Sequence, residues 1–255
     1  MRLLRSAGVI VLCFLSAAMV LLFSWLPRGG VYPWVSRNFW GPGLLWLAGA
    51  KLHVHGSSDL PKGAPCIYYA NHQSLYDIPA LCPALPQALY FVAKKEILKV
   101  PVFGWGMWAI GMVFVDRSNP DRARISMQKA VKAIQKGKHI LAFPEGTRSR
   151  SGELQGFKKG IIHVAKNGQI PMVPIAIVGS KEVLGHDGKL RKGVIHVRIG
   201  TSISAEQIGS MNIRELNDMA HRKLAELIEV QMHANGNHEM HLKQDIKTAK
   251  TTERV

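Results

Sequence analysis

Cysteine and acidic residues are the two kinds of side chain in which this sequence is poor. Its 255 residues include 3 cysteines, which form no C-x-x-C pair and are odd in number: Cys13, Cys66 and Cys82. This pattern argues against a disulfide framework and against a zinc ribbon. The 17 Asp and Glu residues stand against 33 Lys and Arg, which leaves a formal net charge of +16. Such an excess predicts an anionic partner, either nucleic acid, an acidic membrane surface or a phosphorylated substrate.

Charge is also absent from one long stretch near the N-terminus. Residues 6–26 contain no charged side chain, and as a helix they would reach roughly 31 Å, about one hydrocarbon thickness. A second apolar stretch is rich in aromatic residues and is broken by Arg37, so that only residues 38–50 are uninterrupted. Those residues would reach roughly 20 Å as a helix, which is too short to cross. The sequence therefore predicts a membrane anchor over residues 1–50, with one long and one short helix.

Two arrangements of this anchor fit the lengths. A single span with its N-terminus outside would place Arg2 and Arg5 on the far face, against the usual bias for positive residues inside. A hairpin that enters and leaves the same leaflet keeps both arginines on the cytoplasmic side with the rest of the chain. We favour the hairpin, with residues 51–255 at the cytoplasmic face of the inner membrane.

The rest of the chain alternates short apolar runs with amphipathic stretches. Helices are predicted from Pro120 to Gly137 and from Asn212 onward by their apolar spacing and end signals. Strands are predicted at residues 67–70, 111–115, 140–143, 172–178 and 194–199. This alternation indicates an α/β fold with a mixed or parallel sheet flanked by helices. We expect this domain to cover residues 51–233 and a mobile polar tail to follow over residues 234–255.

A histidine and a carboxylate follow the first strand at a spacing of five positions. His72 and Asp77 would not share a face of a straight helix, because five residues turn it by roughly 500°. They can meet if His72 lies in the turn between strand and helix, with Ser74 as a candidate N-cap. Asp77 would then hold one ring N–H and stabilise the imidazolium formed when His72 takes a proton. Taken alone, the pair is better explained as a surface histidine and an unrelated aspartate.

Three more blocks follow strands. Residues 143–149 (Phe-Pro-Glu-Gly-Thr-Arg-Ser) combine a glycine, two hydroxyls and an arginine whose planar fork suits two phosphate oxygens. Residues 111–117 form a strand that ends in an aspartate and an arginine, and residues 173–177 form an apolar strand with a proline near its start. Each alone has an ordinary structural explanation: a polar turn, a solvated ion pair and a strand with a tolerated proline.

Together, in this order and spacing, the four blocks resemble those of the glycerolipid acyltransferase family, in particular the bacterial 1-acylglycerol-3-phosphate acyltransferases. The blocks are residues 71–77, 111–117, 143–149 and 173–175, and the intervening segments at 93–96, 101–104 and 157–160 are also similar to the family. The resemblance covers roughly residues 55–205. It implies acyl transfer from acyl-coenzyme A or acyl carrier protein to the sn-2 hydroxyl of lysophosphatidic acid, which yields phosphatidic acid.

The resemblance also implies roles for individual residues. His72 would be the general base on the acceptor hydroxyl, with Asp77 orienting it and no acyl-enzyme formed. The acceptor phosphate would be bound by Glu145, Gly146, Thr147, Arg148 and Arg117. Three lysines are further candidates for phosphate contacts, although a solvated basic surface explains each of them as well: Lys94, Lys95 and Lys158. Pro174 would shape the acyl or thioester site, and no metal or other cofactor is required.

Other functions fit parts of the sequence. An acyltransferase for another lysophospholipid or a lyso-amino-acid lipid would share the same blocks. A membrane-anchored nucleic-acid-binding protein would explain the charge but leaves His72 and Asp77 unused, so we expect no nucleic-acid partner. A metal-dependent hydrolase with these two residues as ligands is a third alternative, and it would lose activity in a chelator.

Overall fold

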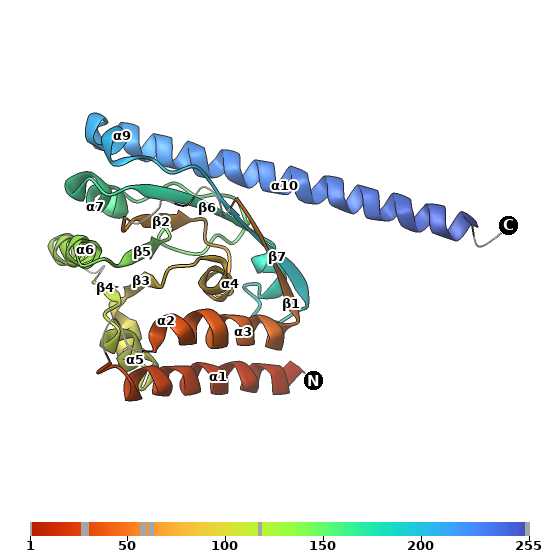
Figure 1. Cartoon of the computed structure of the whole chain (residues 1–255), viewed down its shortest axis with the longest axis horizontal. Helices are drawn as coiled ribbons and strands as arrows, with labels where there is room; N and C mark the ends of the chain where they lie inside the picture. Colours follow the sequence, from red (N-terminus) through yellow and green to blue (C-terminus); the bar gives the residue numbers. More distant parts are fainter. Residues whose placement is uncertain (1, 27–30, 57–59, 61–63, 117–118, 253–255) are drawn as a thin grey trace.

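A seven-stranded sheet forms the centre of the protein (Figure 1). The structure is a computed structural model, and it describes residues 2–26, 31–56, 60, 64–116 and 119–252. The strands are β1 (Ala50–His55), β2 (Ile67–Ala70), β3 (Leu89–Lys94), β4 (Val113–Val115), β5 (His139–Ala142), β6 (Met172–Val178) and β7 (Gly193–Ile199). Their order is β1-β7-β6-β2-β5-β3-β4. Neighbours run parallel except β6 and β7, which are antiparallel. The predicted α/β fold with a mixed sheet is therefore confirmed.

The predicted strands lie where the apolar runs are longest. All four residues of β2 are buried, as are all but the last of β6, because helices cover both faces at the middle of the sheet. The sequence did not predict β1 or β3. In β1 the side chains are exposed or half-buried, as expected of the strand at one edge, so it has no apolar run to identify it.

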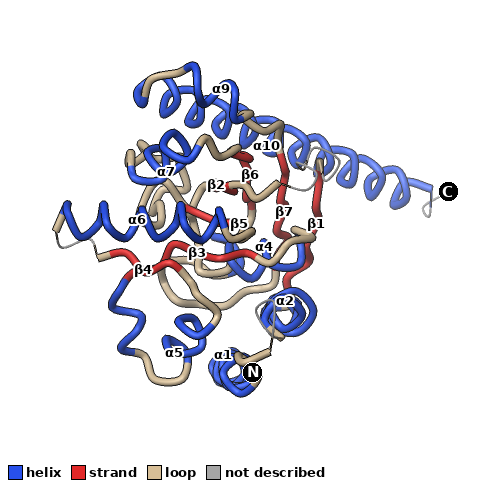
Figure 2. The backbone as a smooth tube through the Cα atoms, turned by 60° about the vertical axis from the view of Figure 1, so that its left-hand side comes forward, coloured by secondary structure: helices blue, strands red, loops and turns tan. Residues whose placement is uncertain are grey.

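Helices cover both faces of the sheet (Figures 1 and 2). They are α4 (Asp77–Ala84), the 3₁₀-helix η4 (Lys95–Lys99), α5 (Phe103–Ala109), α6 (Pro120–Gln135), α7 (Gly160–Gly168), α8 (Ser180–Val183), α9 (Ala205–Ser210) and α10 (Ile213–Thr252). One face carries α6, α7 and α10, and α4 lies on the opposite face under the N-terminal helices. The two layers bury an apolar core against both sides of the sheet.

The N-terminal segment forms two antiparallel helical stretches that lie side by side (Figure 1). The first is α1 (Arg2–Leu22), and the second is a continuous run of α2 (Tyr32–Trp34), the π-helix η2 (Val35–Trp40) and α3 (Gly41–Ala48). The second stretch is longer than predicted, because Arg37 does not interrupt it. The Arg37 guanidinium instead donates a hydrogen bond to the carbonyl of Pro86, 3.0 Å away, and so stays at the surface of the domain.

The residues of the predicted polar tail are helical up to Thr252, and their mobility stays a prediction. Helix α10 runs without a break from Ile213 to Thr252 and extends beyond the domain (Figure 1). Residues 234–252 lack proline and include Ala, Glu, Met, Leu, Gln and Lys, which are good helix formers. Since the helix is already nucleated against the sheet, each added residue extends it at little cost.

Candidate active site

His72 and Asp77 meet at the turn between β2 and α4, as the sequence predicted. His72 Nδ1 lies 2.7 Å from Asp77 Oδ2. The same oxygen accepts the backbone N–H groups of Gln73 and Ser74 at 2.8 and 2.9 Å. The Asp77 side chain is fully buried and the His72 side chain is 16% exposed. Because Nδ1 donates to the carboxylate, the neutral ring leaves Nε2 free of a proton and able to accept one.

Ser74 does not cap α4. The residue before the helix is Tyr76, which makes no side-chain capping bond. Ser74 Oγ accepts the Tyr76 N–H at 3.1 Å and donates to the Leu184 carbonyl at 2.7 Å. The hydroxyl therefore stabilises the turn before α4 and links it to the segment after α8.

The imidazole of His72 is also held on its face and through its backbone. The ring of Phe143, just after β5, stacks on it with centroids 4.0 Å apart and planes inclined by 15°. The His72 carbonyl accepts the N–H of Ser149 at 2.8 Å, and the His72 N–H donates to Glu145 Oε1 at 2.7 Å. The block at residues 143–149 therefore surrounds His72 and limits its movement. Sequence reasoning gave Phe143 no role, because nothing in the sequence aligns its ring with His72.

The Glu145 side chain binds backbone N–H groups of the protein. Its side chain is buried, and its second oxygen accepts the N–H of Gln155 at 3.1 Å. Burial raises the pKa of this carboxyl, while the N–H groups of His72 and Gln155 favour its ionised form. Both oxygens are thus used inside the protein, which disagrees with the phosphate contact that the family resemblance implied for Glu145.

We expect Glu145→Gln to lower kcat on the order of 10- to 100-fold while leaving the KM for the acceptor almost unchanged. An amide has only one acceptor oxygen, so one of the two N–H groups loses its partner and His72 shifts, and displacement of a reacting group by about 1 Å can cost 10²-fold. Steady-state kinetics would measure both constants. Glu229→Gln, at an exposed site on α10, is the control. A higher KM for the acceptor with an unchanged kcat would indicate instead that Glu145 contacts the phosphate.

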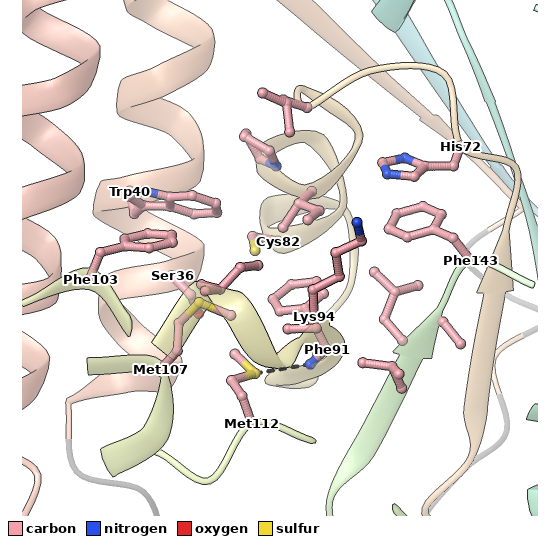
Figure 3. Close-up of a pocket in the computed structure, with 18 of the residues that line it drawn as sticks. Ser36, Trp40, His72, Cys82, Phe91, Lys94, Phe103, Met107, Met112 and Phe143 are labelled. Atoms are coloured by element: carbon pink, nitrogen blue, oxygen red, sulfur yellow. Dashed lines mark hydrogen bonds between the residues drawn. The ribbon is translucent and has the colours of Figure 1, made fainter. Parts of the chain in front are cut away.

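A cavity of about 970 Å³ opens in front of His72. Its far wall is apolar and is built from α1, η2, α4, β3 and α5 (Figure 3). Figure 3 shows His72 and Phe143 at one end, Trp40 and Phe103 at the other, and Lys94 between them. The cavity therefore joins a polar mouth to a long apolar interior. Sequence reasoning assigned α1 and η2 to membrane anchoring and did not place them in this site.

Positive charge gathers at the polar mouth. The residues there include five of those predicted for phosphate binding: Lys94, Gly146, Thr147, Arg148 and Lys158. Gly146 has a φ of +77°, and a Cβ at this position would lie 2.9 Å from the Lys158 side chain, so glycine allows the lysine to lie across the turn. Several cations around one concave mouth can bind a phosphate group.

Two of the other three predicted residues lie elsewhere. Lys95 Nζ pairs with Asp116 Oδ2 at 3.3 Å and is not among the residues that line the cavity. Arg117 lies outside the described residues. Pro174 is within β6, paired with Tyr69 of β2, and its ring packs toward Gly200 and Leu227 of α10. Because α10 covers the other face of the sheet, Pro174 supports the core and does not line the cavity.

Asn71 is a further residue of the site that sequence reasoning gave no role. It is buried, and its side-chain amide exchanges two hydrogen bonds of 2.8 Å with the backbone N–H and carbonyl of Ile177. These two hydrogen bonds from the Asn71 side chain extend the pairing of β2 with β6 beyond the end of β2. They fix the point from which the loop with His72 leaves the sheet. The position of Asn71 beside His72 in the first block was the only signal in the sequence.

Comparisons with known proteins point to one kind of enzyme. The family model described as "Acyltransferase" matches residues 51–178. The chain is 32% identical over 206 residues to the 1-acyl-sn-glycerol-3-phosphate acyltransferase of Pseudomonas aeruginosa, covering 79% of each protein. It is 35% identical over 179 residues to the chloroplastic enzyme of that name from Brassica napus, covering 69% of this chain but only half of the longer relative.

A solved structure shares the fold. The 1-acyl-sn-glycerophosphate (LPA) acyltransferase PlsC from Thermotoga maritima superimposes with a TM-score of 0.77 at 25% identity. The match covers 91% of this chain and 96% of that protein.

Proposed function

Since the chain belongs to the acyltransferase family typified by the 1-acyl-sn-glycerol-3-phosphate acyltransferases, we propose that it acylates the sn-2 hydroxyl of lysophosphatidic acid and forms phosphatidic acid. The donor is an acyl thioester, either acyl-coenzyme A or acyl carrier protein. The observation that carries this proposal is the position of the His72–Asp77 pair, between a cationic mouth and an apolar cavity. A lipid with a phosphate headgroup and a donor with a fatty chain need both environments at one reacting centre.

The proposed reaction needs one base and no covalent intermediate. His72 Nε2 takes the proton of the acceptor hydroxyl while the hydroxyl oxygen attacks the thioester carbonyl. Asp77 stabilises the imidazolium that forms. The tetrahedral intermediate then collapses, the carbon–sulfur bond breaks, and the imidazolium returns its proton to the leaving thiolate. Every bond and proton in this scheme is accounted for without a metal or a cofactor. Turnover should therefore persist in the presence of a chelator, whereas a metal-dependent hydrolase would lose activity.

The apolar interior of the cavity suits a fatty chain. Side chains of Trp40 on η2 and Met107 on α5 lie at its inner end, and Cys13 of α1 lies beside Trp40, whose ring N–H donates to Cys13 Sγ at 3.4 Å. Burial of each methylene is worth about 0.8 kcal/mol, so a chain of ordinary length would gain most of its binding energy there. The site would then recognise the acyl group by burial and the acceptor by charge.

Arg148 is proposed to grip the acceptor phosphate. We expect Arg148→Ala to raise the KM for lysophosphatidic acid by roughly 10- to 100-fold, because a charge-assisted hydrogen bond is worth about 1.5–3 kcal/mol. Arg148→Lys should recover only part of this loss, since an ammonium cannot make the bidentate contact. Kinetics with the acceptor and the donor varied in turn would measure the effect. Arg150→Ala, at an exposed site two residues away, is the matched control. A change confined to the KM for the donor would mean that Arg148 binds the donor and not the acceptor.

Membrane association is proposed from the N-terminal helices. The segment Arg5–Leu22 of α1 has a mean hydropathy of 2.1 and is long and apolar enough to cross a membrane. It nevertheless packs along the domain: a Cβ at Gly8 would lie 3.1 Å from Leu47 of α3, and one at Gly106 of α5 would lie 3.3 Å from Ala17. This packing supports a hairpin in one leaflet over an isolated span.

The proposed membrane is the inner membrane, with the domain on its cytoplasmic side, where acyl thioesters are found. The net charge of +16 would favour binding to acidic lipids. A single cysteine at position 2, in a chain whose native cysteines are replaced, tests this topology. Labelling of that cysteine from outside intact spheroplasts by an impermeant reagent would contradict the hairpin.

The acceptor is the decisive test of the proposed activity. The full chain would be purified in detergent, returned to vesicles and assayed with each donor against lysophosphatidic acid, lysophosphatidylethanolamine and a lyso-amino-acid lipid. We expect phosphatidic acid as the main product. A clear preference for one of the other lysolipids would assign the second candidate function, acylation of that lipid by the same pair of residues.

A further inference from the structure

Helix α5 carries two large aromatic side chains that contribute nothing to the core. Trp105 and Trp108 are 54% and 67% exposed. The opposite side of the same helix faces the cavity through Phe103 and Met107, and Ile110 just after the helix faces it too. Helix α5 is therefore a thin wall with the cavity on one side and an uncovered tryptophan surface on the other. Exposed tryptophans in close succession are unusual on a surface that faces only water.

This surface is continuous with the exposed apolar side of α1. The two helices pack directly, with Gly106 against Ala17, and Figures 1 and 2 both show α5 next to α1 at the edge of the molecule away from α10. The exposed side of α1 is apolar and includes Ile10, Val11, Phe14, Leu15 and Leu22. A flat lipid surface that covers α1 would therefore meet α5 as well.

The composition of α5 suits a lipid interface better than a protein partner. The helix contains no charged residue, and exposed lysines lie just before it in η4, at Lys95 and Lys99. Tryptophan prefers the headgroup level, where its ring is apolar and its N–H can reach water. Lysines at the edge of such a surface are attracted to acidic headgroups.

The backbone before α5 holds the helix in a fixed orientation. Val102 has φ +63° and ψ −57°, and the Phe103 N–H donates to the Pro101 carbonyl across it at 2.6 Å. This is a γ-turn at a β-branched residue, which is a strained conformation. Gly104 follows at a close approach, since a Cβ there would lie 2.3 Å from the Ile97 carbonyl oxygen. The tryptophans are thus presented by a strained, tightly packed turn.

We propose that the tryptophan surface of α5 is a second membrane contact, separate from the N-terminal anchor and part of the acyltransferase domain itself. Trp105 and Trp108 insert at the headgroup level of the leaflet that α1 occupies, with Lys99 beside acidic lipids. The wall of the cavity then rests on the membrane. This inference depends on the membrane association proposed above, and it adds a contact that α1 alone does not supply.

Single-tryptophan proteins test the contact without reference to activity. The full chain has 6 tryptophans; in each variant all but one are replaced by phenylalanine, which leaves Trp105, Trp108 or Trp46 of α3. The proteins are bound to vesicles of phosphatidylethanolamine and phosphatidylglycerol, with or without brominated acyl chains. We expect bromine to quench Trp105 and Trp108 as it quenches Trp46. The control is Val230→Trp in the tryptophan-free chain, at an exposed site on α10, which should stay unquenched.

Two results would overturn the proposal. Quenching of Trp46 without quenching of Trp105 and Trp108 would mean that only the anchor touches lipid, or that a second protein copy covers α5. Equal quenching of Val230→Trp would mean that the protein has no fixed orientation on the vesicle. If the replacements disturb folding, the double variant Trp105→Phe/Trp108→Phe in the otherwise native chain gives the same information. Its total quenching should fall relative to the native protein, and an unchanged value would count against the contact. Turnover plays no part in the readout, so an inactive protein that quenches would refute the acyltransferase proposal alone.

Discussion

Replacement of His72 by alanine should lower turnover by at least 10²–10⁴-fold, the range expected for loss of a general base. His72 is the group whose free nitrogen faces the cavity, because Nδ1 is bound to Asp77. The acceptor KM should change little, since the phosphate is proposed to bind to the cations at the mouth. Product formation from lysophosphatidic acid under saturating conditions is the measurement.

His163→Ala provides the matched control, because this histidine is exposed on α7 and is not among the residues that line the cavity. Circular dichroism would show that both variants are folded. Turnover near the native rate in a folded His72→Ala protein would remove His72 from the mechanism. Another group at the mouth of the cavity would then have to accept the proton.

Asp77→Asn should lower kcat on the order of 10³–10⁴-fold while keeping the fold. An asparagine whose oxygen takes the place of Oδ2 can still accept the three hydrogen bonds from His72, Gln73 and Ser74. Its amide nitrogen would then occupy the site of Oδ1, a buried atom that has no hydrogen-bond partner among the described residues. The geometry survives but the negative charge opposite the imidazolium is lost, and the same substitution in a comparable triad lowers kcat by about 10⁴.

Asp77→Ala is the informative comparison. It removes all three hydrogen bonds and leaves two buried backbone N–H groups without partners, at a cost of about 1–3 kcal/mol each. We therefore expect a lower midpoint of thermal unfolding for the alanine variant and a nearly native one for the asparagine variant. Asp218→Asn, exposed on α10, controls for loss of a carboxylate elsewhere. A fully active Asp77→Asn protein would show that the charge is not needed.

The sequence by itself was enough for features that depend on near neighbours. Buried strands such as β2 and β6 were predicted from their apolar runs, and the pairing of His72 with Asp77 followed from a spacing that one turn can close. The cationic turn at Gly146 and Arg148 was identified in the same way. In each case the interacting groups lie within a few residues, so local geometry leaves few alternatives.

Only the tertiary structure decided how distant segments share the site. The cavity is completed by α1, η2 and α5, whose apolar residues are equally typical of a membrane anchor or a core helix. The role of Glu145 changed for the same reason, because its carboxylate is satisfied by backbone N–H groups 10 and 73 positions away. Pro174 and Arg37 likewise could not be placed until their partners in α10 and at Pro86 were known. Composition and spacing show which apolar and charged groups are available, whereas the direction in which each side chain points is set by long-range packing.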